Sequence, residues 1–113
     1  MASERDPTMD ECIRHCTDCH AACIETVQYC LEQGGAHADP AHLALMATCA
    51  DICRTSADAM LRGTAAHVHT CRACAAICDL CAASCESMGD DGTMQRCAQA
   101  CRRCAASCAR MAA

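Results

Sequence analysis

Sixteen cysteines are the residues of this chain whose type and spacing could carry chemistry. Within four separate stretches they recur at steps of three, four or seven residues, and no cysteine departs from this spacing. In an α-helix such steps place side chains on one face. Thiols that share a face can bind soft metals, form disulfides or act in redox chemistry. The sixteen candidates are Cys12, Cys16, Cys19, Cys23, Cys30, Cys49, Cys53, Cys71, Cys74, Cys78, Cys81, Cys85, Cys97, Cys101, Cys104 and Cys108.

The helix face that carries the cysteines, which we call the seam, extends to nine further positions in the same register. None of the seam positions is Leu, Ile or Val. Leu would bury more apolar area than Cys at each of them, so a purely structural core of neutral thiols explains one or two cysteines but not a whole seam. The nine further residues are Thr26, His42, Met46, Ser56, Met60, His67, Met88, Met94 and Met111.

Helix-start and helix-stop residues divide the chain into four segments. Capping side chains open each segment, and glycines close the first three. The predicted helices are about 9–33, 40–62, 65–88 and 93–111. The predicted starts are Thr8 with Glu11, Asp39 before Pro40, Thr64, and Thr93 or Asp91; the predicted stops are Gly34 with Gly35, Gly63 and Gly89.

The segments are rich in helix-forming Ala, Arg, Glu and Gln, whereas the β-branched and aromatic residues typical of strands are scarce. Short connections favour antiparallel neighbours. We therefore expect an all-α fold, an antiparallel up-and-down four-helix bundle with a Cys-lined core over residues 8–113. Residues 1–7 are predicted to be a flexible N-terminal tail.

The composition restricts the possible partners and reactions. A chain of 113 residues forms one domain, and its net charge of -5 disfavours nucleic acid. No apolar run reaches the roughly 18 residues of a membrane span, and no Gly-rich phosphate loop is present. The N-terminal residues lack an apolar signal segment, so we expect a cytoplasmic protein, in which thiols stay reduced.

An enzymatic role is not predicted. A thiol oxidoreductase would use one CxxC motif at a helix N-terminus, where the pKa of its thiol is lowered. Sixteen equivalent cysteines do not single out a nucleophile. No Ser/His/Asp arrangement and no pair of carboxylates stands out either.

The arrangement of the cysteines favours Cu(I) among metals. Disulfide scaffolds and iron–sulfur motifs place cysteines in loops, and zinc knuckles place CxxC pairs in turns. Here CxxxC and CxxC overlap along helices, and thioethers stand near the ends of the seam, which suits a soft ion. Side chains at i and i+4 have Cβ atoms about 5–6 Å apart, so two sulfurs can hold one ion in near-linear coordination. A zinc buffer and a disulfide-stapled bundle without metal remain alternatives.

Three cysteine motifs carry a resemblance to a known family. CxxxCxxCxxxC occurs in the first and fourth segments, and CxxCxxxCxxCxxxC occurs in the third. Over residues 8–111 the chain resembles the cytosolic branch of the cysteine-rich four-helix-bundle copper storage proteins. The resemblance implies many Cu(I) ions along the bundle axis, a homo-oligomer of bundles, and copper uptake at one open end where His and Met help. The loop at residues 89–92 lacks the histidines expected there.

Seam residues near the helix ends are candidate auxiliary ligands, since an up-and-down bundle gathers them into two clusters. We expect the end beside the first and third connections to be the mouth, because it has both thioethers and an imidazole. His15 and His20 flank the seam and are expected at the surface. The mouth holds His42, Met46, Met88 and Met94, next to Cys30, Cys49, Cys85 and Cys97, and the opposite end holds Met60, His67 and Met111.

Charge balance predicts the copper load. Sixteen thiolates with eight Cu(I) ions would leave about eight uncompensated negative charges in a narrow core, which is costly. Thiolates that each bridge two ions bring the ratio towards one copper per sulfur. The expected function is therefore Cu(I) storage or sequestration, with copper ions as the cargo and copper donor or acceptor proteins as possible partners.

Overall fold

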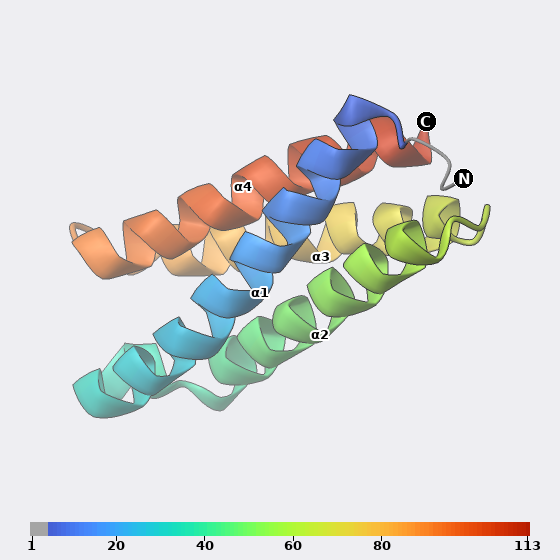
Figure 1. The fold of residues 1–113 in the computed structure, drawn as a ribbon. Helices are drawn as coiled ribbons and strands as arrows, with labels where there is room; N and C mark the ends of the chain where they lie inside the picture. Colours follow the sequence, from blue (N-terminus) through green and yellow to red (C-terminus); the bar gives the residue numbers. More distant parts are fainter. Residues whose placement is uncertain (1–4) are drawn as a thin grey trace.

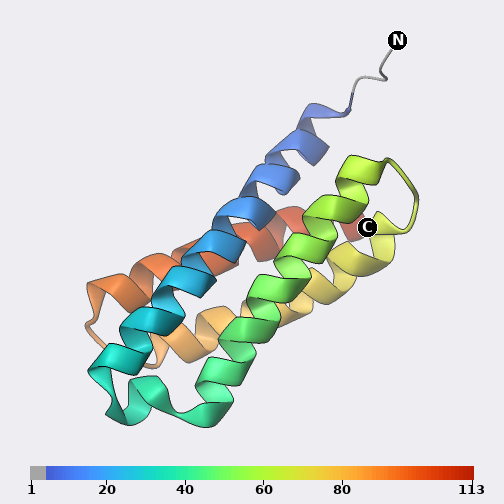
Figure 2. The ribbon, with the colours of Figure 1, turned by 60° about the horizontal axis from the view of Figure 1, so that its bottom comes forward.

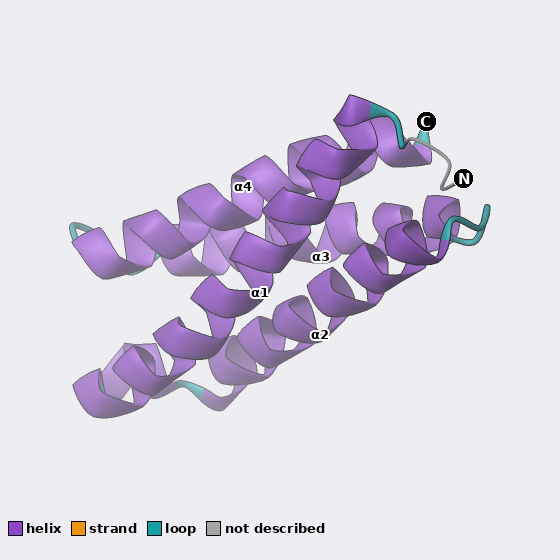
Figure 3. Ribbon diagram, in the orientation of Figure 1, coloured by secondary structure: helices purple, strands orange, loops and turns teal. Residues whose placement is uncertain are grey.

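The computed structural model describes residues 5–113 as four α-helices and one short 3-10 helix. The helices α1 and α2 form one antiparallel pair, α3 and α4 form another, and the two pairs pack face to face (Figure 1). Short loops and turns, with the 3-10 helix between the first two α-helices, join them, and no strand occurs among the described residues (Figure 3). The predicted all-α four-helix bundle is confirmed. The elements are α1 (Pro7–Gln33), η1 (Gly35–Ala38), α2 (Pro40–Arg62), α3 (His67–Glu86) and α4 (Gly92–Ala112).

The two ends of the bundle differ in what connects there. The α1–α2 connection, which includes η1, and the α3–α4 connection lie at one end (Figures 1 and 2). The start of α1, the end of α4 and the α2–α3 connection lie at the other. The described chain is elongated, with extents of 51 × 23 × 21 Å. A seam that runs along all four helices therefore lines one long axis. No helix in residues 5–113 combines the length and apolarity needed to cross a bilayer.

The start of α1 differs from the prediction. Asp6, not Thr8, is the cap, because its carboxylate accepts the backbone N–H of Thr8 at 2.8 Å. Pro7 then occupies the first turn, where its missing N–H is harmless. The same Asp-Pro arrangement opens α2 at Asp39 and Pro40, as predicted. Of the predicted tail, residues 1–4 lie outside the described part of the chain.

The boundaries of α3 also differ. Thr64 does not cap α3 with its side chain; its backbone carbonyl lies 2.8 Å from Nδ1 of His67, the first residue of the helix. The helix ends at Glu86, and Gly89 follows in the turn with φ of 75°. Of the two candidate caps for α4, Asp91 performs the task, by accepting the backbone N–H of Met94 at 3.1 Å.

Sulfur fills the core. All sixteen cysteines are at most 2% exposed, which confirms that the seam faces the bundle axis. The predicted seam residues Thr26, His42 and Ser56 are buried as well, and Met46 joins them at 0% exposure. The aliphatic residues beside the seam pack against this core and are half-buried. Small seam side chains thus let four helices approach closely around a column of thiols.

The metal-free protein is expected to be strongly helical. Hydrogen-bonded neutral thiols and flanking aliphatic side chains already form a packed interior, so no ion is needed to bring the helices together. Far-UV circular dichroism of reduced, metal-free protein checks this. A coil spectrum that turns helical only when copper is added would mean instead that metal binding drives folding.

Candidate metal centre

The thiols lie close enough to share metal ions. Sγ–Sγ distances between helices are 3.5 Å for Cys16 and Cys108 and 3.6 Å for Cys19 and Cys101. A disulfide bond would require about 2.05 Å. All sixteen cysteines are free thiols in the structure, so the disulfide-stapled alternative is not formed.

Neighbouring groups of thiols overlap. Three groups of four cysteines and one group of three each have their Sγ atoms within 4.8 Å of one another. Three cysteines each belong to two groups and so link all four groups into one continuous set: Cys19, Cys104 and Cys108. Four separate tetrahedral zinc sites would each need four ligands of their own. Sharing favours bridging thiolates over independent sites. The groups are Cys16–Cys74–Cys104–Cys108, Cys19–Cys53–Cys78–Cys104, Cys19–Cys23–Cys49–Cys101 and Cys12–Cys71–Cys108.

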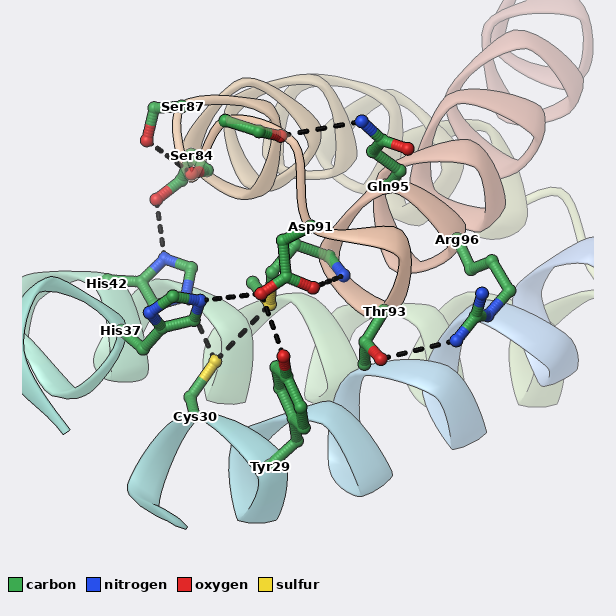
Figure 4. Close-up of polar contacts among 12 residues, drawn as sticks. Tyr29, Cys30, His37, His42, Ser84, Ser87, Asp91, Thr93, Gln95 and Arg96 are labelled. Carbon is green, nitrogen blue, oxygen red and sulfur yellow. Dashed lines mark hydrogen bonds and ion pairs between the residues drawn. The ribbon is translucent and has the colours of Figure 1, made fainter. Parts of the chain in front are cut away.

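Four cysteines near the α1–α2 and α3–α4 connections stand outside these groups, and one of them contacts auxiliary ligands. The Cys30 Sγ atom lies 3.5 Å from Nε2 of His42 (Figure 4). It also lies 3.7 Å from Sδ of Met94. A thiol, an imidazole and a thioether from three helices therefore converge at the predicted mouth. All three atom types are ligands for Cu(I). The four cysteines are Cys30, Cys81, Cys85 and Cys97.

His42 is held ready to bind through one nitrogen. Burial lowers the pKa of its imidazole, so the ring is neutral at pH 7. Its Nδ1 lies 2.6 Å from the Ser84 hydroxyl (Figure 4). With Nδ1–H donating to Ser84, Nε2 presents its lone pair towards Cys30. Sequence reasoning missed Ser84, although the residue stands next to the seam position Cys85.

The other predicted mouth residues also lie at this end. Met46 and Met94 are fully buried. Met88 is half-buried and lines, with His42 and Ser84, a surface cavity of about 400 Å³ between α2 and the end of α3. The structure thus brings His42, Met88 and Met94 to one end of the sulfur column, with a hollow that opens to solvent beside His42.

The opposite end has a different character. Met60 is buried, whereas Met111 and His67 are only half-buried. The His67 ring hydrogen-bonds the backbone of the α2–α3 turn, and among the described residues no hydrogen bond joins it to a sulfur. The seam there contains Ser56, whose hydroxyl lies 3.2 Å from Cys71 Sγ. A hydroxyl is a poor ligand for a soft ion, so the sulfur column thins towards this end.

His15 and His20 are not the plain surface residues that the sequence predicted. His15 Nδ1 hydrogen-bonds the buried hydroxyl of Ser107 on α4, and His20 Nδ1 lies 2.8 Å from the backbone carbonyl of Ala50 on α2. Both histidines are half-buried. Their rings tie α1 to its two neighbours, a role that depends on contacts between distant parts of the chain.

Burial and mutual hydrogen bonding keep the thiols protonated in the absence of metal. Burial raises the pKa of Cys30. Hydrogen bonding with Cys101, reinforced by burial, raises the pKa of Cys23 as well. The thiolate is the form that binds metal, so ions displace protons as they enter.

A four-helix bundle with a continuous thiol core is a metal-binding bundle of the storage type, and the comparison with known families agrees. Residues 5–113 match the family model of the copper storage proteins. The chain therefore belongs to the copper storage protein family, which confirms the resemblance seen in the cysteine motifs.

Similar proteins include both solved structures and a bacterial sequence. The Nmul_A1745 protein from Nitrosospira multiformis is 42% identical, with a TM-score of 0.89 over 96% of this chain and 97% of that one. The Cu(I)-bound copper storage protein BsCsp3 is 36% identical, with a TM-score of 0.85 over 94% of this chain and 99% of that one. The uncharacterized cysteine-rich protein YhjQ of Bacillus subtilis (strain 168) is 36% identical over 76 residues, 67% of this chain and 70% of that protein.

Proposed function

We propose that this chain stores Cu(I) ions along its axis, bound by the thiolates of its sixteen cysteines. The observation that carries the proposal is the column of buried thiols, whose groups share Cys19, Cys104 and Cys108. Metal–sulfur bonds of about 2.3 Å allow one ion to join sulfurs up to about 4.6 Å apart. The Sγ–Sγ contacts of 3.5 to 4.0 Å fall within that reach. Family membership and the Cu(I)-bound state of BsCsp3 support the choice of metal.

Storage fits the site better than catalysis or single-ion transfer. No thiol stands apart as a nucleophile, because all sixteen are buried to the same degree. A carrier that hands over one ion would need two or three ligands, not a column of sulfur. Electroneutrality sets the expected load nearer sixteen ions than eight. Anaerobic titration of the reduced protein with Cu(I) tests the proposal, and uptake well beyond eight ions per chain is expected.

Copper enters, in this proposal, at the end of the bundle where His42, Met88 and Met94 lie. Cys30 contacts both His42 and Met94, so an ion held by these side chains is already bound to the first thiol of the column. The cavity beside His42 gives solvent access to this point. These auxiliary residues act as transient soft ligands that pass ions inward.

Replacing Met46, Met88 and Met94 together by Leu is expected to slow the initial uptake of Cu(I) from a weak donor several-fold. The change keeps the apolar volume, so the bundle should remain folded. The total capacity should fall little, because thiolates hold most of the metal. Stopped-flow measurement of uptake, with a titration of capacity on the same samples, checks both expectations.

The matched control is the replacement of Met60 and Met111 by Leu at the opposite end. This variant should take up copper at the wild-type rate. If the control slows uptake and the first variant does not, copper enters near His67 instead. Unchanged rates in both variants would make the methionines simple core residues.

The setting of the protein is part of the same proposal. We place the chain in the cytoplasm, where reduced thiols persist and Cu(I) must be sequestered. Copper donor or acceptor proteins would exchange ions at the mouth. A homo-oligomer of bundles is supported by aliphatic side chains that are more than half exposed on the helices. They are Ile24, Leu31, Leu61 and Leu80.

A further inference from the structure

One carboxylate at the mouth contacts three separate segments of the chain. The Oδ1 atom of Asp91 accepts the backbone N–H of Met94 at 3.1 Å. Its Oδ2 atom accepts the phenolic O–H of Tyr29 at 2.8 Å and lies 2.9 Å from Nε2 of His37 (Figure 4). The three partners belong to the start of α4, the end of α1 and η1. Asp91 therefore ties together both connections at this end of the bundle.

Each of the three segments carries, or leads directly into, one auxiliary or thiol ligand of the mouth. Tyr29 is adjacent to Cys30, and η1 leads directly into the first turn of α2, which contains His42. Met94 donates its own backbone N–H to Asp91. These are the side chains whose Sγ, Nε2 and Sδ atoms meet at 3.5 and 3.7 Å. The position of each ligand thus depends on a segment that Asp91 holds.

An ordinary helix cap explains only one of these contacts. Asp6 and Asp39 cap α1 and α2, each through one side-chain hydrogen bond to a backbone N–H. Asp91 adds a phenol and an imidazole, and the rings of Tyr29 and His37 also pack edge to face with centroids 5.9 Å apart. Local helix stability does not require this second set of contacts.

We propose that Asp91 is a positioning residue for copper uptake: it holds Cys30, His42 and Met94 in register without binding the ion itself. The inference rests on the proposed storage function. A carboxylate is a hard ligand, and both oxygens of Asp91 are already occupied by hydrogen bonds, so the ion stays with sulfur and imidazole. The backbone N–H of Met94, with the hydroxyl of Tyr29 and the ring of His37, lowers the pKa of Asp91 to about 2, so the carboxylate is charged when it accepts these bonds.

The variant Asp91→Ser separates the two roles of this residue. Serine remains a good cap for α4 but cannot reach Tyr29 or His37. We expect the initial rate of Cu(I) uptake from a weak donor to fall at least about tenfold, because two hydrogen bonds to a charged group are lost. Total copper capacity and far-UV circular dichroism should stay at wild-type values. The matched control Asp6→Ser, at the opposite end, should leave the uptake rate unchanged.

A second pair of substitutions keeps the α4 cap intact. The double variant Tyr29→Phe with His37→Ala removes both additional partners and should slow uptake to a similar extent. Combined with Asp91→Ser, it should add nothing further, since the three side chains act as one unit. In nuclear magnetic resonance spectra of the metal-free protein, the His42 side-chain signals should move in Asp91→Ser and stay at their wild-type positions in Asp6→Ser.

The outcomes keep this inference apart from the storage proposal. Failure of the wild type to bind more than eight ions would overturn storage itself. If the wild type stores copper while Asp91→Ser and the double variant load at the wild-type rate, only the positioning role of Asp91 is wrong. Additive slowing by the two sets of substitutions would also contradict a single unit.

Discussion

Loading the reduced protein with Cu(I) is expected to raise its midpoint of thermal unfolding by roughly 20 °C or more. Each ion joins thiolates from different helices, as the contact of Cys16 on α1 with Cys104 and Cys108 on α4 illustrates. A ligand that binds the folded state at 100 times its dissociation constant adds about 2.7 kcal/mol of stability, and several ions add in sequence. Unfolded chains also bind copper through their cysteines, so the gain is the difference between the two affinities.

Circular dichroism melts under anaerobic conditions, at increasing ratios of Cu(I) to protein, measure this effect. The midpoint should rise steadily up to the full load, because each group of thiols along the axis adds new links between helices. The parallel series with zinc is the control, and its effect should be much smaller. A midpoint that does not move with copper, or that moves as much with zinc, would contradict copper-bridged helices.

The fold and the sulfur column could be predicted from sequence because both depend on local periodicity. Cysteines at steps of three and four lie on one face of each helix. Because that face contains no Leu, Ile or Val, the thiols themselves must form the core. The structure confirms this for residues as different as Cys12, Ser56 and Met94, all of which are fully buried. The copper storage motifs then pointed to the family that the match over residues 5–113 confirms.

The errors and omissions arose where two signals compete or where contacts are distant. Asp6 and Thr8 are both good helix caps. Pro7 lies between them, and its fixed φ angle favours the first helical position, so the helix begins after Asp6. The contacts of His42 with Ser84 and of Tyr29 with Asp91 join residues 42 and 62 positions apart. Periodicity carries no information about such pairs, because it describes each helix by itself and not how neighbouring helices are aligned.

Capacity is the quantity in which the competing metal-binding accounts differ most. Bridging thiolates bring the charge of the core close to neutral at one Cu(I) per sulfur. Isolated two-ligand sites would instead saturate at eight ions and leave about eight negative charges uncompensated. The overlap of the groups at Cys19, Cys104 and Cys108 favours bridging. Separate tetrahedral zinc sites would use the same sixteen cysteines in sets of four.

The most direct test is anaerobic titration of fully reduced protein with Cu(I), followed by removal of unbound metal and elemental analysis of copper, zinc and sulfur. The account predicts that binding continues well beyond eight Cu(I) ions per chain and approaches one ion for each of the sixteen cysteines. Saturation at about four zinc ions per chain, with Cu(I) bound no better, would contradict it.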